Sequence, residues 1–90
     1  MTAEDRNKLT TLSLRYVYRH RLSVDAMRMY LESSGSANAL FCIWLELSEE
    51  TRGIISRLYV MNLLLTKEGA ERFAADCNLT VAEACMLAFN

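Results

Sequence analysis

Hydrophobic residues recur at helical spacing from the start of the chain. Between residues 3 and 19, Leu9, Leu12 and Tyr16 fall on one face of a helix, while the other faces are polar and basic. A one-sided apolar stripe of this kind is typical of a helix that packs against a core. The pattern therefore predicts a first amphipathic helix over residues 3–19.

A second, shorter helix is predicted over residues 24–33. Val24, Met27 and Leu31 share one face and are expected to point inward. Gly35 follows this segment, and glycine adopts the left-handed backbone conformation that commonly ends a helix. The helix is therefore expected to close at Gly35.

The last third of the chain repeats the helical pattern twice, with a break at Asn78. Both segments place apolar or small residues at positions i, i+3, i+4 and i+7. These residues are Ala70, Phe73, Ala74 and Cys77, followed by Val81, Ala84, Cys85 and Ala88. The repeat predicts a closing helical hairpin.

The middle of the chain allows two interpretations, because residues 37–47 and 52–65 are apolar on every side. Helices are favoured: Glu49 and Glu50 would lie at the positive N-terminal end of the second segment, which also exceeds the length of a typical strand. The alternative is an α+β fold with a hairpin at 40–65, in which residues 40–47 pair with 57–65.

Residues that can cap helix N-termini mark the expected boundaries, because their side-chain oxygens accept from free backbone N–H groups. The candidates are Thr2, Ser23, Ser36, Ser48, Thr66 and Thr80. Glu83 stands three residues after Thr80, which fits a capping box. These signals predict a single all-α domain over residues 1–90, a compact bundle of about five or six short helices.

Composition agrees with one small globular domain and excludes several classes of protein. The chain has 90 residues, 52% of them hydrophobic, and a net charge of −1. Its apolar runs are shorter than a membrane span, and its polar start lacks the layout of a secretory signal. Three cysteines, Cys42, Cys77 and Cys85, suit buried free thiols in a reducing compartment. A cytoplasmic protein with no membrane partner is expected.

The spacing of the residues matches no known pattern for catalysis or for cofactor binding. The cysteines and His20 lack the spacing of a metal site, and the single histidine has no obvious nucleophile beside it. The three glycines are isolated, so no phosphate-binding loop exists. We therefore predict that the chain is not an enzyme, with no catalytic residue, cofactor or metal.

The closing hairpin has the residue spacing of a helix-turn-helix, with Asn78 at the turn. However, residues 81–89 contain no Arg, Lys, Gln or Asn that could reach base edges. A helix-turn-helix-like DNA-binding transcription regulator is therefore the alternative function, and a nucleic-acid partner is not favoured.

Charge and surplus apolar surface indicate a binding protein. Residues 1–30 carry six cations and three anions, whereas residues 31–90 carry four cations and eight anions. Trp44 belongs to an apolar segment that one neighbouring helix could not cover. The residues expected to contact a partner are Arg15, Tyr18, Arg19, Arg21, Trp44, Glu49, Glu50, Glu68 and Glu71.

The function predicted from these features is a small protein–protein interaction module. It would act as a regulator, adaptor or inhibitor, of the type that phages and mobile elements carry, by sterically occupying a partner's binding surface. The partner is another protein or protein complex. A homodimer is also expected, because a second copy could cover part of the apolar surplus.

Overall fold

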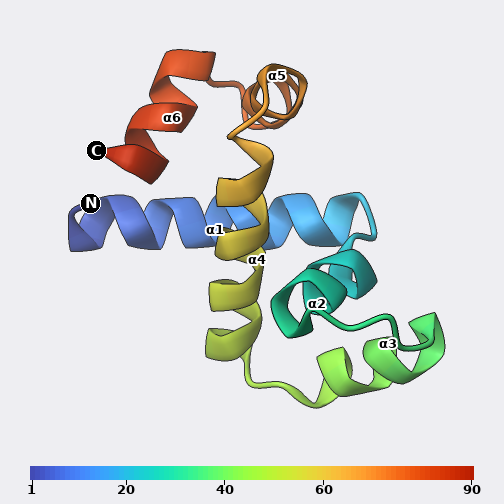
Figure 1. The fold of residues 1–90 in the computed structure, drawn as a ribbon. Coiled ribbons are helices and arrows are strands. Elements are labelled where there is room, and N and C mark those ends of the chain that lie inside the picture. The colour runs from blue at the N-terminus through green and yellow to red at the C-terminus, as the bar shows by residue number, and fades with distance from the viewer.

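Six helices joined by short connections make up the chain, and no strand is present (Figure 1). The computed structural model describes all of residues 1–90. The helices are α1 (Ala3–Arg19), α2 (Ser23–Leu31), α3 (Ala37–Glu46), α4 (Glu49–Leu63), α5 (Lys67–Asp76) and α6 (Val81–Phe89). The expected all-α bundle is therefore confirmed.

The alternative hairpin at 40–65 is wrong, because the proposed turn is the beginning of α4. The Ser48 side chain accepts a hydrogen bond from the backbone N–H of Thr51, and Glu49 and Glu50 occupy the first helical turn. Both carboxylates face the positive end of the helix dipole. These local interactions start a helix where a hairpin would have reversed the chain.

Five of the six predicted N-caps are confirmed. Each accepts a hydrogen bond from the backbone N–H three residues ahead, and Thr80 and Glu83 form the expected capping box. Ser23 is the exception: it is the first residue of α2 and buried, while Leu22 stands at the cap without a side-chain hydrogen bond. The turn before α2 is too tight to leave Ser23 outside the helix.

Three helices end in Schellman motifs, and none uses glycine. Arg21, Glu32 and Asn78 adopt positive φ angles of 55°, 49° and 56°. At each site the next residue's N–H reaches back to a carbonyl of the preceding helix, as when Leu22 donates to Val17 at 2.8 Å. The expected closure of α2 at Gly35 is therefore wrong, because the chain has already turned at Glu32.

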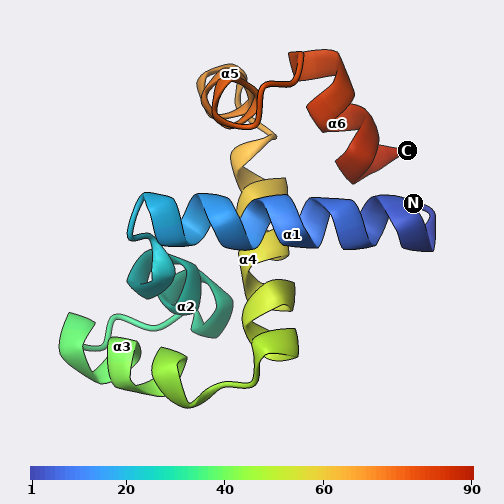
Figure 2. The ribbon, with the colours of Figure 1, turned by 180° about the vertical axis from the view of Figure 1, so that it is seen from behind.

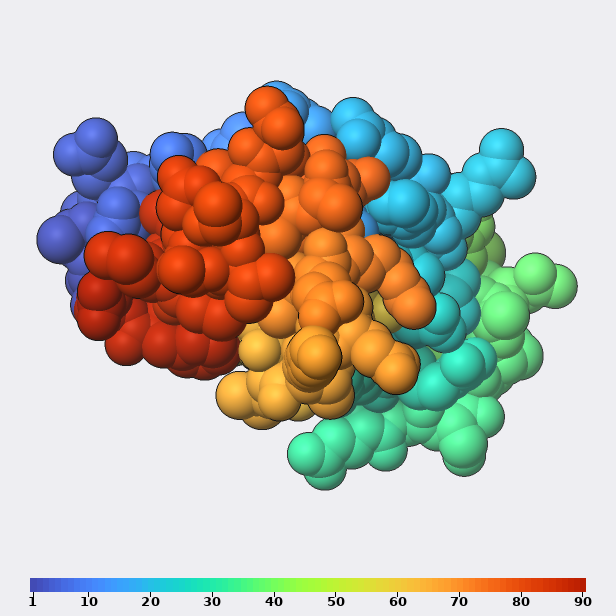
Figure 3. Space-filling model, turned by 90° about the horizontal axis from the view of Figure 1, so that it is seen from above, coloured from blue at the N-terminus to red at the C-terminus, as the bar shows by residue number.

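The helices pack on both sides of a crossing between α1 and α4, as the front and rear views show (Figures 1 and 2). On one side, α5 and α6 cover a core that includes Leu9, Tyr16, Val60 and Phe73. Figure 3 shows this α5–α6 side from outside, with α6 beside the N-terminal part of α1. None of the six helices has the length and hydropathy to cross a membrane.

On the other side of the crossing, α2 and α3 enclose a smaller core. It consists of Val17, Ala26, Met27, Leu40, Trp44 and Ile55. The half-buried ring of Tyr59 packs against both cores and joins them. The molecule is thus one helical bundle with two apolar centres.

Leu31, which is expected to point inward, and Val81, which belongs to the apolar pattern of the last segment, are both exposed. Leu31 is 45% exposed and Val81 is 40% exposed. Leu31 is the last residue of α2 and Val81 the first of α6. Both therefore lie where the chain leaves or enters a helix, beyond the part of the helix that the core covers.

Small residues line the α1–α4 crossing. A Cβ added at Gly53 would lie 2.8 Å from Thr10 Cγ2 and 3.5 Å from Leu14 Cδ1, so α1 lies directly against this glycine. Ser13 of α1 and Ser56 of α4 are fully buried, and neither hydroxyl has a hydrogen-bond partner. The two hydroxyls are therefore a cost to stability that close helix packing has to offset.

We predict that Ser56→Ala stabilises the protein. Removing an unpartnered buried hydroxyl and introducing the best helix former should raise the free energy of unfolding by about 1 kcal/mol. For a domain of this size the melting temperature should rise by about 4–8 °C in a circular dichroism melt. Ser56→Val is the control: its added bulk at the crossing should lower stability by about 1–3 kcal/mol. A lower melting temperature for Ser56→Ala would contradict this account of the crossing.

Candidate protein-binding groove

Helix α3 is held by one face and leaves most of its apolar surface in solvent. Only Leu40 and Trp44 are buried, whereas Phe41, Ile43 and Leu45 are between 43% and 58% exposed. The helix contains no lysine or arginine. Phe41 and Leu45 stand four positions apart and share one face of the helix, and exposed apolar surface of this kind marks interaction sites in small proteins.

A groove of about 420 Å³ lies where the end of α1 and the start of α2 meet α3. We call it the α3 groove, and it is lined by Tyr18, Arg21, Ser23, Val24, Phe41, Trp44 and Leu45. Five of these seven side chains are hydrophobic, and none carries a negative charge. Its size lies within the range of ligand-binding pockets.

The local structure of three helices positions these side chains. Tyr18 is on the last turn of α1, and its ring meets the Trp44 ring edge-on with centroids 6.2 Å apart. The Schellman turn after α1 places Arg21 at the mouth of the groove. From α4, Arg52 donates a 2.9 Å hydrogen bond through Nη1 to the Tyr18 hydroxyl.

Hydrogen-bond donors around the α3 groove outnumber the acceptors available to them. The indole N–H of Trp44 and the Nε–H of Arg52 are buried without a partner. Arg21 forms no ion pair, because the cations that do so are Arg19, His20, Arg28 and Lys67. The two buried N–H groups are a cost to the fold that no outside group can relieve, because they have no accessible surface, whereas Arg21 is exposed and can donate to an acceptor from outside the chain.

Three of the nine residues predicted to contact a partner thus come together in the α3 groove: Tyr18, Arg21 and Trp44. Arg52 was missed by the sequence reasoning, because it joins Tyr18 across 34 positions and no local pattern marks that pairing. Phe41 and Leu45 could have been predicted, since they belong to the apolar segment that one neighbouring helix could not cover.

The other predicted cations lie elsewhere. Arg19 and His20 both contact the Asp76 carboxylate, at 3.2 Å and 3.1 Å, and so tie the end of α1 to α5. Arg15 lies on this side of α1 as well, close enough to the Cys77 thiol to act on its charge. The run from Arg15 to Arg21 is therefore two separate surfaces and not one basic patch.

The predicted acidic residues are also divided between two places. Glu49 and Glu50 line a polar groove of about 530 Å³ between α1 and α4, beside Arg6 and Arg57. Glu68 and Glu71 are exposed on α5, where Glu71 lies 4.0 Å from Lys67. They form no continuous acidic face, and cations already accompany both groups.

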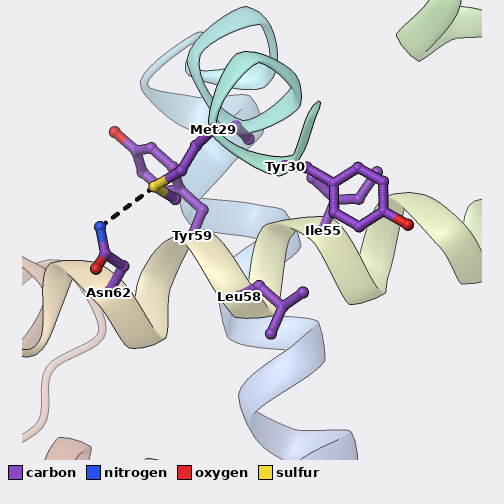
Figure 4. Close-up of a pocket in the computed structure, with 7 residues that line it drawn as sticks. Met29, Tyr30, Ile55, Leu58, Tyr59 and Asn62 are labelled. Atoms are coloured by element: carbon purple, nitrogen blue, oxygen red, sulfur yellow. Dashed lines mark hydrogen bonds between the residues drawn. The ribbon is translucent and has the colours of Figure 1, made fainter. Parts of the chain in front are cut away.

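A second apolar cleft, of about 330 Å³, separates α2 from α4. Figure 4 shows Met29 and Tyr30 of α2 above Leu58 and Asn62 of α4, with Asn62 donating to the Met29 sulfur at 3.2 Å. Ala26, Ile55 and Tyr59 complete the lining, and no charged residue takes part. We call this the α2–α4 cleft.

The cysteines correct one expectation. All three are free, but Cys42 is exposed on α3, and Cys77 and Cys85 are only partly buried. Burial raises the pKa of the Cys77 thiol, with Asp76 adding to the effect. No three His, Cys, Asp or Glu side chains lie together in an arrangement that could hold a metal ion.

Comparisons with protein-family models, with curated proteins and with solved structures found no match to this chain. What the molecule itself offers are the geometry of the two apolar sites and the charges around them.

Asp76 is the carboxylate that links α5 to the end of α1, through Arg19 and His20. Partial burial raises its pKa, but hydrogen bonds from His20 and Arg19 and the charges of the same two groups outweigh burial. The pKa of Asp76 consequently lies below its usual value. A lowered pKa means that the ionised carboxylate stabilises the folded state, and this contribution is lost as the pH falls through the folded-state pKa.

We predict that Asp76→Asn lowers the free energy of unfolding at pH 7 by about 0.5–1 kcal/mol, the range of exposed ion pairs. The deficit should shrink below about pH 4, where the aspartate of the unfolded chain takes up its proton. Denaturant unfolding of both proteins at several pH values measures the difference. Glu71→Gln is the control, because its contact with Lys67 is long and exposed, and it should change little at any pH. A deficit of equal size at every pH would exclude the proposed ionic origin.

Proposed function

We propose that this protein is a small, non-catalytic module that binds another protein through α3 and the α3 groove. It would act as a regulator, adaptor or inhibitor by covering the surface that its partner uses for other contacts. The observation that carries this proposal is the exposure of Phe41, Ile43 and Leu45 on a helix held by two buried side chains. Burying these three side chains in a complex would be favourable by hydrophobic transfer.

The composition of the site supports a protein partner. Protein interfaces are enriched in aromatic residues, methionine and arginine and depleted in lysine and acids at their centre. The α3 groove contains Tyr18, Phe41, Trp44 and Arg21, with no lysine and no acid. Anchors of these residue types carry most of the binding energy in many complexes.

The helix-turn-helix alternative has less support from the same kind of evidence. In such motifs the second helix of the pair enters the major groove. Here that helix is α6, whose exposed side chains include Val81, Glu83, Met86 and Phe89. Apolar and acidic groups at this position favour neither phosphate contact nor base readout.

We predict that Leu45→Glu abolishes capture of the native partner. The tagged protein and its variants would be used for affinity purification from the native cell after nuclease treatment, followed by mass spectrometry. A charge at this exposed position should cost little stability but should oppose burial in a complex. Leu65→Glu is the matched control, because Leu65 is also exposed, at 70%, but lies between α4 and α5. It should retain the partner.

Retention of the same partner by Leu45→Glu would place the binding site elsewhere. Recovery of DNA or RNA that disappears on nuclease digestion, with no protein partner, would favour the helix-turn-helix alternative. Melting curves of both variants establish that they are folded.

We also propose that the protein forms a homodimer, and the α2–α4 cleft supports this. Residues near the axis of a two-fold contact meet their own copies, which suits a surface without charge. We predict that light scattering during gel filtration gives twice the 10.3 kDa chain mass at high concentration, and the single-chain mass for Leu58→Glu. A mass of one chain at every concentration would contradict this prediction.

A further inference from the structure

We infer that the α3 groove recognises an acidic, apolar segment of the partner protein, which places a large apolar side chain over Trp44 and a carboxylate beside Arg21. This inference rests on the proposed function and specifies the chemistry of the partner. Three features of the groove support it: its apolar floor, its lack of hydrogen-bond acceptors and its positive charge.

The floor of the groove fits an apolar side chain. Trp44 is fully buried beneath the groove, so the surface that a partner would contact is that of the exposed Phe41 and Leu45 on α3, and Val24 of α2 also lines the groove. At about 420 Å³ the groove can take a large aliphatic or aromatic side chain together with part of its backbone. Water in the groove would find few polar partners there, so its displacement favours binding.

The rim of the groove lacks acceptors. Arg21 has no carboxylate partner, and Arg52 uses Nη1 for the Tyr18 hydroxyl while its buried Nε–H stays unpaired. The Trp44 indole N–H is also buried and unpaired. Both buried N–H groups are out of a partner's reach, so Arg21, which is exposed and lines the groove, is the donor that a carboxylate of a protein partner can contact.

The charge of the site argues against a second copy of this chain as the occupant. In a two-fold contact centred on the α3 groove, Arg21 and Arg52 would approach their own copies, which is unfavourable. The charge-free α2–α4 cleft has no such conflict. An acidic partner segment would instead meet the exposed positive charge of Arg21.

The number of cations argues for a peptide carboxylate over a nucleic acid. Proteins that bind nucleic acid neutralise many phosphates, and their affinity depends on clusters of Lys and Arg. Only Arg21 lines the groove, with Arg52 next to it, and the net charge of the chain is −1. One carboxylate matches this site better than a row of phosphates.

The test selects 12-residue peptides from a random display library on the full-length protein. Each enriched peptide is synthesised twice, once with its Asp or Glu residues and once with Asn or Gln in their places. Affinity is measured by fluorescence anisotropy on wild type, on Arg21→Gln and on Arg6→Gln. Arg6 provides the matched control, because it is an exposed arginine at the opposite end of α1. Trp44, the only tryptophan, gives a single indole N–H resonance that reports on the groove directly.

The expected result is a peptide family with a large apolar residue next to Asp or Glu. The acidic form should bind wild type about five- to tenfold more tightly than the amide form. Arg21→Gln should remove this preference and Arg6→Gln should keep it. Binding should also move the Trp44 indole resonance.

Several outcomes would overturn the inference. They are an absence of enriched peptides, equal affinities for the acidic and amide forms, and a Trp44 resonance that does not respond. A Trp44 resonance that shifts with protein concentration alone would indicate that a second copy of the chain occupies the groove. A Trp44 resonance that shifts on addition of single-stranded DNA would indicate that nucleic acid occupies it. Leu45→Glu could lose the native partner while the acidic and amide peptides bind with equal affinity. In that case α3 is the binding face, and only the inferred preference for a carboxylate is wrong.

Discussion

Where α1 and α4 cross, the two helices lie so close together that a Cβ added at Gly53 would be 2.8 Å from Thr10 Cγ2. Ser13 of α1 and Ser56 of α4, both small, are fully buried. This is the most extensive contact between any two helices of the molecule, and every other helix is arranged around it. Close approach forces the larger apolar residues of both helices to either side of the crossing. Two cores result: the larger one is covered by α5 and α6, and the smaller one by α2 and α3.

The smaller core explains why α3 is so exposed. Its six buried residues include only Leu40 and Trp44 from α3, although that helix is apolar on nearly every face. No further helix follows to cover the remaining side chains, because the chain returns through α4 to the other side of the crossing (Figure 2). Trp44 thereby serves two purposes, anchoring α3 to the bundle and forming the floor of the groove. The proposed binding surface is the apolar remainder of a helix that the division into two cores leaves half covered.

Local signals predicted most of the fold. Helix starts depend on one side chain and the next three residues, so five caps could be identified from single threonines and serines, and the pattern of Leu9 and Tyr16 marked the buried face of α1. Helix ends were harder to predict, because Arg21 and Glu32 adopt the left-handed conformation although neither is a residue type that favours it.

The candidate site was predictable only in part. Tyr18, Arg21 and Trp44 were identified by type, but Arg52 reaches Tyr18 across 34 positions, and Asp76 reaches His20 across 56. Such contacts depend on the crossing, which no spacing in the sequence reveals.

The same crossing decides what each cation near the end of α1 can do. Arg19 and His20 face α5, where Asp76 neutralises them and the contact stabilises the bundle. Arg21 lies beyond the helix and lines the α3 groove, and none of the residues that line the groove is acidic. Its left-handed backbone costs about 1 kcal/mol that glycine would avoid, and no ion pair within the chain compensates for it. Of the three consecutive cations at this end of α1, Arg21 is therefore the one whose charge no carboxylate of the chain neutralises, which is the reason why the proposed binding site is placed there.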